Sequence, residues 1–375
     1  MNRVFILGAR RTGISPRNGA LKRIPFYDLA ARVVDRLSSD LSGLATTPPS
    51  FTALIAGNAL GAGGNPARLM ALASNLPWTI PAMTIDTQCC SGLDAIGVAF
   101  QQLRSRPHGS VHAVATAEKG LVLAGGAESA SLAPIRQDRQ SGVTYEEAPF
   151  TPWLDCSPDM VQAALNLEAQ RHVTVLDMVN WAIKSHRLGL HQSVPSRLGS
   201  DTLPRVLTPE LCHRAAGFKA YNPTLMAPLA DGAAFVAMAS SVLQPAELEG
   251  GASLLEILDY CQIGSDPGCP GLSTAALDPW LRKLETKFGF NRQNLVVSLM
   301  ESFAAQVLVN IQDLGLNGEL INPWGGLLAK GHPIGASGAV LVCDLFDYLQ
   351  HGHFGLAAIP ASGGLASGLL VRRVT

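Results

Sequence analysis

Short apolar segments, glycine-rich turns and apolar helical segments alternate along this chain, and the alternation occurs twice. Residues 52–56 form an apolar segment that ends at glycine and leads into a helical pattern in the first half. Residues 295–299 begin a similar order of strand and helix in the second half. Buried strands that alternate with buried helices are typical of layered α/β proteins. We therefore predict an α/β fold built by duplication, with halves at residues 1–250 and 251–375.

A segment of different composition interrupts the first half, at about residues 130–225. Residues 134–158 are rich in Pro, Gln, Asp and Thr and have no sustained periodicity. Helical patterns return at residues 160–170 and 176–188, and an apolar strand at residues 231–238 resumes the alternation. We expect this segment to lie outside the layers of strands and helices.

The charge balance argues against nucleic acid and anionic membranes as the main partners. Lysine and arginine total 28 against 29 acidic residues, which gives a formal net charge of −1, so no basic surface is indicated. No apolar stretch approaches the roughly 18 residues of a membrane-spanning helix. Charged residues make up only 15% of the chain and glycine occurs 37 times. This composition favours close packing and a large interface, so we expect a homo-oligomer.

The cysteine pattern and the N-terminal residues predict a reduced protein of the cytoplasm. None of the seven cysteines forms a CxxC pair, so neither a metal site nor a redox motif is predicted. The apolar run at residues 4–7 is too short for a signal peptide and has the pattern of a first strand. Reduced thiols without a secretion signal fit a cytoplasmic location.

Cys89 lies where a short strand meets a helix. A strand-like pair at residues 84–85 precedes it, and apolar residues recur at helical spacing after Gly92. A thiol before a helix N-terminus faces free backbone N–H groups, which lower its pKa and can bind an oxyanion. The alternative is a small buried core residue. Cys89 is therefore a candidate nucleophile.

His332 is the best candidate for the base that such a nucleophile needs. It lies in the glycine-rich segment 325–338, where glycines allow the backbone to approach a ligand and Pro333 fixes the local geometry. A purely structural histidine is the alternative. A second glycine-rich segment, residues 57–68, could cradle a phosphate, although it fits neither the P-loop nor the dinucleotide fingerprint.

Several motifs in register resemble the thiolase family, and the resemblance covers essentially the whole chain. The four most specific are Cys89-Cys90-Ser91-Gly92-Leu93-Asp94-Ala95, Gly125-Gly126-Ala127-Glu128-Ser129, Glu301-Ser302-Phe303-Ala304-Ala305-Gln306 and Gly331-His332-Pro333-Ile334-Gly335-Ala336-Ser337-Gly338. The segments 57–68, 185–187 and 231–234 also resemble family segments. On this basis the chain is identified as a member of the thiolase family.

The resemblance implies a duplicated five-layer αβαβα fold in which each half has five strands. It also implies that residues 130–225 form a loop domain inserted in the first half, and that the chain forms a homodimer or homotetramer. The family moves acyl groups between coenzyme A thioesters through an acylated cysteine. The implied ligand is thus acyl-coenzyme A, a small-molecule substrate, and the family implies no cofactor or metal.

Roles for individual residues follow from the same resemblance. Cys89 would be the acylated nucleophile, and His332 would activate it and help to bind a thioester oxygen. The backbone N–H groups of Cys89 and Ser362 would form an oxyanion site. Ala227 and Phe303 would lie in the substrate-binding region.

The chain departs from the family pattern at two catalytic positions and one binding position. Pro360 occupies the place of the second catalytic cysteine, and losing such an acid/base group typically costs about 10²–10⁴-fold in rate. Met300 replaces an asparagine that holds a water at the other oxyanion site, where one lost donor can cost about 10²–10³-fold. Ala227 stands in place of a serine near the pantetheine.

Three functions remain open after these departures. The first is a thiolase-type acyltransferase that acts through Cys89 but without ordinary Claisen condensation or thiolysis. The second is a non-catalytic or partner-dependent subunit that binds acyl-coenzyme A. The third is a hydrolase that releases acyl groups from Cys89 to water. We favour the first, because Cys89 and His332 are both retained.

Overall fold

The computed structural model describes residues 2–42, 50–105, 120–153, 159–190, 194–217, 221–240 and 254–374. Residues 104–119 are polar and irregular in sequence, which predicts an exposed loop, but almost all of them lie outside the described residues, as does Cys156. Among the described residues, no helix has the length and apolar character needed to cross a membrane.

Five strands of the first half form one part of a mixed sheet, in the order β4-β3-β5-β9-β1. Their bounds are β1 (Val4–Thr12), β3 (Phe51–Gly57), β4 (Ala82–Ile85), β5 (Leu121–Ser129) and β9 (Ala230–Ser240). β3 runs parallel to β4 and β5, whereas β9 runs antiparallel to both β5 and β1. The buried strands predicted at residues 52–56 and 231–238 are both present.

The second half contributes four strands among the described residues, in the order β11-β12-β13-β10. Their bounds are β10 (Leu255–Gly264), β11 (Val296–Leu299), β12 (Phe354–Ala361) and β13 (Leu365–Arg373). In place of the fifth strand that we expected in this half, Ile321 forms an isolated bridge to Val297. A short antiparallel pairing of β1 with β10 joins the two parts into one continuous sheet.

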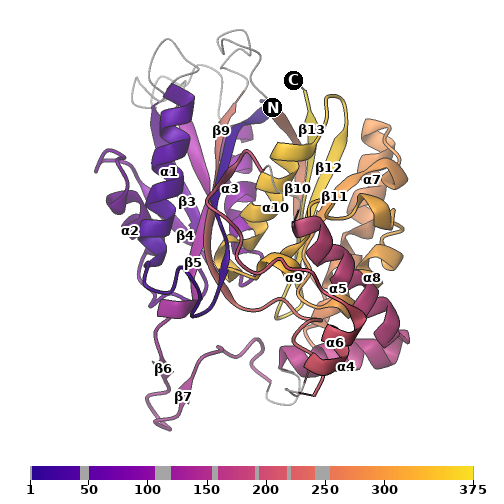
Figure 1. Cartoon of the computed structure of the whole chain (residues 1–375). Coiled ribbons are helices and arrows are strands. Elements are labelled where there is room, and N and C mark those ends of the chain that lie inside the picture. Colours follow the sequence, from indigo (N-terminus) through magenta and orange to yellow (C-terminus); the bar gives the residue numbers. More distant parts are fainter. Residues whose placement is uncertain are drawn as a thin grey trace.

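Helices cover both parts of the sheet and also separate them (Figure 1). α3 (Ser91–Ser105) and α10 (Ile334–Tyr348) contact strands of both halves and lie between them. α1 (Phe26–Ser42) and α2 (Pro66–Ala73) pack on the outer side of the first part, in one apolar core. α7 (Asp278–Phe288) and α8 (Ala304–Asp313) pack on the second part, in another. The layers therefore run αβαβα, as expected.

Glycines bring the two central helices close together. A Cβ atom at Gly338 of α10 would lie 2.4 Å from the backbone nitrogen of Leu93 in α3. A Cβ atom at Gly92 would lie 2.8 Å from the backbone oxygen of Gly335. Because only glycine allows this approach, the first turns of α3 and α10 meet. The segments that precede them, which carry Cys89 and His332, therefore lie side by side.

The first-half insertion forms a helical unit that packs against the second half. Its helices are α4 (Met160–Arg171), α5 (Val175–Gly189) and α6 (Pro209–Ala215), so the helical patterns at residues 160–170 and 176–188 are confirmed. Apolar residues of this unit share a core with α8. The preceding residues 130–153, which we call the arm, extend away from the layers (Figure 1).

Two predictions for the second half need correction. The sequence pattern of residues 274–288 predicts one helix, but the structure divides the segment, because a 3₁₀ helix, η4 (Pro270–Leu277), precedes α7. The predicted glycine loop 325–338 is partly helical, since α9 (Leu327–Lys330) lies inside it and α10 already begins at Ile334. The remaining short elements are β2 (Ser15–Pro16), η1 (Ala130–Leu132), β6 (Arg136–Gln137), β7 (Thr144–Tyr145), β8 (Arg197–Leu198), η5 (Arg292–Asn294) and η6 (Gly318–Leu320).

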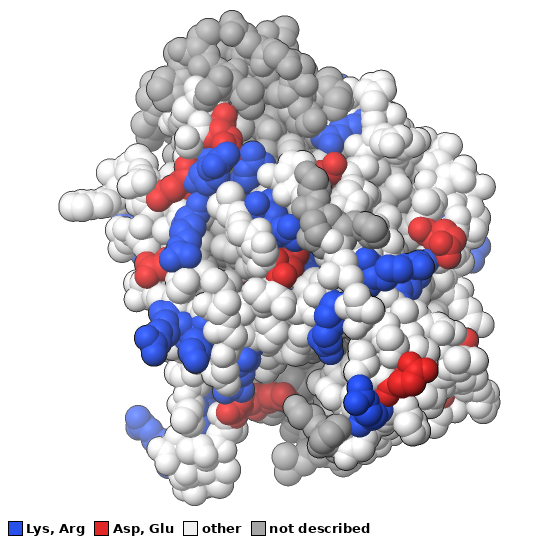
Figure 2. Space-filling model, viewed as in Figure 1, with Lys and Arg blue, Asp and Glu red and all other residues white. Residues whose placement is uncertain are grey.

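Charged side chains do not form a single basic face in the view of Figure 2. Lys and Arg side chains lie in several groups there, with Asp and Glu side chains among them. The arrangement on this face agrees with the nearly balanced composition of the chain.

Candidate active site

A tight turn places Cys89 in front of α3. The backbone N–H groups of Cys90 and Ser91 donate to the backbone oxygens of Thr87 and Gln88 at 3.2 and 3.1 Å. Gln88 has a φ of 56°, a left-handed conformation that non-glycine residues rarely adopt. Such strain persists only where the surrounding structure enforces it, and it is frequent at functional sites.

Asp94 ties this turn to the second half of the protein. Its buried carboxylate accepts hydrogen bonds from Thr87 Oγ1 in the turn (2.5 Å) and from Tyr260 on β10 (2.8 Å). Ser367 on β13 donates to it as well, at 2.5 Å. Burial raises the pKa of Asp94, and these donors oppose that shift. The position of the Cys89 turn is thus coupled to two strands of the second half.

His332 lies next to Cys89 with a defined tautomer. Its Nε2 is 3.2 Å from Cys89 Sγ, and its Nδ1 is 2.6 Å from Ser337 Oγ. The Ser337 hydroxyl donates its single hydrogen to the backbone oxygen of Pro333 (3.1 Å). With the Ser337 hydrogen assigned to this oxygen, Ser337 accepts from Nδ1–H. This leaves Nε2 as a proton acceptor that faces the thiol.

Both partners of this pair are neutral at physiological pH. Burial raises the pKa of the Cys89 thiol to about 12, although the backbone N–H groups of Ser362 and Cys89 oppose the shift. Burial lowers the pKa of His332 to about 4. The expectation that a helix N-terminus would lower the thiol pKa is therefore wrong, because desolvation of the charged form outweighs the backbone dipoles.

This protonation state predicts how alkylation of Cys89 depends on pH. Only the thiolate reacts with iodoacetamide, and below its pKa the thiolate fraction grows about tenfold per pH unit. The alkylation rate of Cys89, followed by mass spectrometry of its peptide, should rise without a plateau between about pH 7 and pH 10. A free-thiol peptide should level off above about pH 8.5. A Cys89 rate that is flat over this range would indicate a preformed thiolate–imidazolium pair instead.

The two predicted oxyanion groups converge on Cys89. Ser362 follows β12 in a turn whose Gly363 and Gly364 have φ angles of 79° and 75°. The backbone N–H of Ser362 and that of Cys89 both lie close enough to Sγ to lower the thiol pKa. A carbonyl oxygen bound beside the sulfur would meet the same two donors.

A cavity of about 290 Å³ opens beside this pair. Its lining brings together Cys89, His332 and Ser362 with the predicted substrate-binding residues Ala227 and Phe303. The backbone N–H of Ala227 donates to the backbone oxygen of Ser302 at 2.9 Å, so Ala227 is anchored next to the Phe303 segment. The arm contributes much of the remaining wall: Ala130, Ala133, Pro134, Ile135, Arg136, Glu146, Glu147, Ala148 and Phe150.

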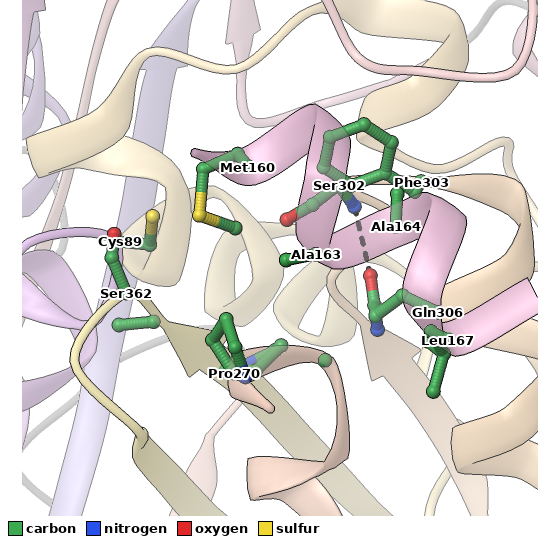
Figure 3. Close-up of a pocket in the computed structure, with 13 residues that line it drawn as sticks. Cys89, Met160, Ala163, Ala164, Leu167, Pro270, Ser302, Phe303, Gln306 and Ser362 are labelled. Carbon is green, nitrogen blue, oxygen red and sulfur yellow. Dashed lines mark hydrogen bonds between the residues drawn. The ribbon is translucent and has the colours of Figure 1, made fainter. Parts of the chain in front are cut away.

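A second, smaller cavity of about 20 Å³ also borders Cys89 (Figure 3) and shares Met160, Ser302, Phe303 and Ser362 with the larger one. Cys89 and Met160 carry their sulfur atoms toward the same space, and α4 supplies one wall. Most of the lining is apolar or small: Met160, Ala163, Ala164, Leu167, Pro270, Gly271, Phe303, Pro360 and Ala361. Pro360, which we expect at the position of the family's second cysteine, thus forms part of an apolar wall.

Neither Met300 nor Glu301 presents a side chain to the two cavities beside Cys89. Met300 is fully buried in the central core and lines neither cavity. Glu301 is also fully buried, and its carboxylate accepts hydrogen bonds from Trp181 (3.1 Å), Ser185 (2.7 Å) and Asn322 (2.7 Å). Glu301 therefore fixes α5 to the segment before α9 and lines neither cavity.

Glu128 is a structural determinant of the site that the sequence motifs did not reveal. Its buried carboxylate accepts from the backbone N–H groups of Ala59 and Gly335, both at 3.0 Å, and of Leu60 at 3.3 Å. Burial raises its pKa to about 7 despite these donors. The backbone amides of the glycine-rich segment 57–68 thus bind a side chain of the protein itself, which argues against the phosphate site considered for that segment.

The described residues contain no group of three or more His, Cys, Asp or Glu side chains placed to hold a metal ion. Of the residues named from the sequence, Cys89, His332, Ser362, Ala227 and Phe303 converge on one cavity, whereas Met300 stays outside it.

Comparison with known proteins relates both halves of the chain to one family. The thiolase N-terminal domain matches residues 4–204, and the thiolase C-terminal domain matches residues 253–373. A relative from Staphylococcus aureus (strain MRSA252), named "Putative acetyl-CoA C-acetyltransferase VraB", is 29% identical over 402 aligned residues, which cover 100% of both proteins.

Solved structures resemble the whole chain as well. The crystal structure of the Bacillus anthracis acetyl-CoA acetyltransferase superimposes with a TM-score of 0.83 at 27% identity, covering 100% of this chain and 99% of that one. Acat5 thiolase from Ascaris suum, solved in complex with coenzyme A, gives a TM-score of 0.80 at 25% identity, covering 99% and 100% of the two chains.

Proposed function

The chain belongs to the thiolase family, and from this membership we propose that it transfers acyl groups from coenzyme A thioesters through a covalent thioester on Cys89. The observation that carries the proposal is the 3.2 Å contact between Cys89 Sγ and His332 Nε2. A sulfur nucleophile with a base in hydrogen-bond reach, itself oriented by a third group, is the arrangement that covalent acyl transfer needs.

Acylation would begin from the neutral thiol and imidazole. As Sγ attacks the thioester carbonyl, its proton passes to His332 Nε2, because the two atoms already face each other. The negative charge that develops on the carbonyl oxygen would be bound by the backbone N–H groups of Cys89 and Ser362. The C–S bond to coenzyme A then breaks, and its sulfur leaves with the proton held by His332.

Acyl-coenzyme A would occupy the 290 Å³ cavity as a substrate. Ala227 and Phe303 line this cavity together with the reacting pair. Relatives named as acetyl-coenzyme A acetyltransferases, and an Ascaris suum thiolase solved with coenzyme A, support this class of substrate.

Ordinary Claisen condensation and thiolysis are not part of this proposal. Both need an acid/base group at the substrate's alpha carbon, and proline at position 360 has no titratable group. The methionine at position 300 cannot donate the hydrogen bond that an asparagine would supply. Acylation of Cys89 requires neither an acid/base group at position 360 nor a hydrogen-bond donor at position 300.

Exchange of coenzyme A tests the proposal without requiring any carbon–carbon chemistry. The protein is incubated with unlabelled acyl-coenzyme A and isotopically labelled free coenzyme A, and labelled acyl-coenzyme A is measured by mass spectrometry. An acyl-Cys89 intermediate predicts exchange with at least one of the acetyl, butanoyl and octanoyl thioesters. Absence of exchange with all three would contradict the proposal.

Replacing Ser337 by alanine should slow this exchange by about tenfold. The substitution leaves the buried Nδ1–H of His332 without its partner, which costs about 1–3 kcal/mol, and it frees the ring to adopt the other tautomer. The exchange rate at saturating substrate should fall while the KM stays unchanged. Ser38→Ala is the matched control, because the Ser38 hydroxyl makes the same bond to a preceding helical carbonyl, that of Val34, at 2.8 Å. Equal rates in the two variants would contradict the positioning role.

A non-catalytic or partner-dependent subunit that binds acyl-coenzyme A is the alternative. The substitutions at Met300 and Pro360 favour it, since both remove groups used by standard members of the family. It predicts co-purification with a second protein and no exchange by the isolated chain. Exchange catalysed by a purified homodimer or homotetramer, the assemblies we propose, would exclude it.

A further inference from the structure

We propose that water is the acceptor of the acyl group on Cys89, so that the protein hydrolyses acyl-coenzyme A to a free carboxylic acid. This inference rests on the acyl-Cys89 intermediate of the proposed function and specifies the fate of that intermediate. The structural basis is that the two cavities beside Cys89 differ in chemistry. The smaller cavity lacks a base that could generate a carbon nucleophile. The larger cavity suits a neutral nucleophile that carries its own proton.

The smaller cavity offers no group that could deprotonate a substrate carbon. Among its lining residues that the structure describes, Cys89 is the only one with a titratable side chain. The amide of Gln306 is already fully engaged: Oε1 accepts from the Ser302 backbone N–H (3.0 Å), and Nε2 donates to the Met300 backbone oxygen (3.0 Å) and to Asn310 (2.5 Å). A substrate carbon therefore meets no group in the smaller cavity that could accept its proton and form a carbanion.

Acidic side chains outnumber arginines three to two in the lining of the larger cavity, where Arg136 is the second arginine beside Arg17. Asp86 and Glu147 line it together with Cys89, and both residues are exposed. Glu146 is neutralised by Arg17 at 2.7 Å, whereas Glu147 has no ion-pair partner among the described residues. Burial is the main cause of the raised pKa of Cys89, and the charges of Asp86 and Glu147 add to it. The same charges would disfavour a coenzyme A thiolate or a carbanion beside the acylated sulfur.

Water meets the remaining requirements. It is neutral, it reaches a cavity that opens to solvent, and it brings the proton that His332 Nε2 can accept. The water oxygen attacks the acyl carbonyl of acyl-Cys89 while its proton passes to His332, and the backbone N–H groups of Cys89 and Ser362 bind the oxyanion. The C–S bond then breaks, and the sulfur takes the proton back from His332. The step yields one carboxylic acid and the starting thiol, with no other reactant.

The experiment follows both products in water enriched in ¹⁸O. The purified chain is mixed with acetyl-, butanoyl- or octanoyl-coenzyme A, and quenched samples are analysed for coenzyme A, free acid and 3-ketoacyl-coenzyme A. With at least one of the three thioesters, we expect a rapid release of about one coenzyme A per site and then a steady release with an equal amount of acid. Each acid molecule should carry one ¹⁸O from the solvent.

Glu147→Gln tests the role of the negative charge. It should raise the ratio of coenzyme A exchange to hydrolysis by about two- to fivefold, the effect of one charge near the reacting sulfur in a solvated cavity. Asp138→Asn is the matched control, because it removes one charge from an exposed position of the same arm outside the cavity. An unchanged ratio in Glu147→Gln would contradict the electrostatic argument.

The outcomes separate this inference from the proposed function. Without any release of coenzyme A, acylation itself fails and both proposals fall. An initial release without continued formation of acid leaves acyl transfer standing and overturns hydrolysis. Coenzyme A release that is matched by 3-ketoacyl-coenzyme A would also overturn hydrolysis, because the acceptor would then be a carbon nucleophile.

Discussion

Replacement of Cys89 by alanine is expected to reduce coenzyme A exchange by at least about 10⁴-fold, to the background rate, because it removes the atom that forms the covalent bond. The measurement is the rate at which labelled coenzyme A enters acyl-coenzyme A. Cys89 is only partly buried and lies in a turn fixed by backbone hydrogen bonds. The folded structure should therefore survive the change, with a thermal unfolding midpoint close to that of the unmodified chain.

Cys90→Ala is the matched control for this variant. Cys90 is fully buried, and its Sγ donates to the backbone oxygen of Ile359 at 3.4 Å, away from both cavities. Its loss should lower stability by about 1 kcal/mol through a small cavity, and exchange should continue at a rate within a few-fold of the unmodified chain. Exchange that persists in Cys89→Ala and disappears in Cys90→Ala would show that Cys90, and not Cys89, is the nucleophile.

Replacement of His332 by alanine should reduce exchange by about 10²–10⁴-fold, the usual contribution of a positioned acid/base group. The reduction should approach about 10⁴-fold. Without a base, the high pKa of the Cys89 thiol leaves almost no thiolate at neutral pH. The loss should shrink as the pH rises, since hydroxide can then remove the thiol proton. Rates measured from about pH 7 to pH 10 give the comparison.

His353→Ala is the control for a general effect of removing a histidine. His353 is exposed and follows α10, remote from the candidate site. Exchange in this variant should match that of the unmodified chain over the whole pH range. A His332→Ala enzyme with full activity at neutral pH would show that Cys89 is activated in some other way.

The residues of the candidate site could be predicted from the sequence because they lie in local motifs. Cys89 precedes a recognisable helix, His332 lies among glycines, and both belong to motifs whose order is specific. Their close approach depends on Gly92 and Gly338, which are part of the same motifs. The layered α/β architecture was predictable for a similar reason, since buried strands and helices alternate visibly.

Properties that depend on tertiary burial could not be predicted in this way. The pKa of the Cys89 thiol is raised rather than lowered, because the protein atoms packed around the sulfur disfavour its charged form. Glu128 and Glu301 each hold backbone or side-chain donors from distant segments, a role that no local pattern indicates. Glu147 lies in a segment without periodicity, so only the structure brings it to the cavity of Cys89.

Mass spectrometry of the protein after brief exposure to acyl-coenzyme A shows whether Cys89 itself becomes acylated. Acid-quenched samples are digested, and the peptide that contains Cys89 and Cys90 is fragmented to locate any added acyl group. We predict one acyl group on Cys89 with at least one of the acetyl, butanoyl and octanoyl thioesters, and no acyl group on this peptide in Cys89→Ala. A Cys89 that stays unmodified with all three thioesters, at concentrations that support binding, would contradict this prediction.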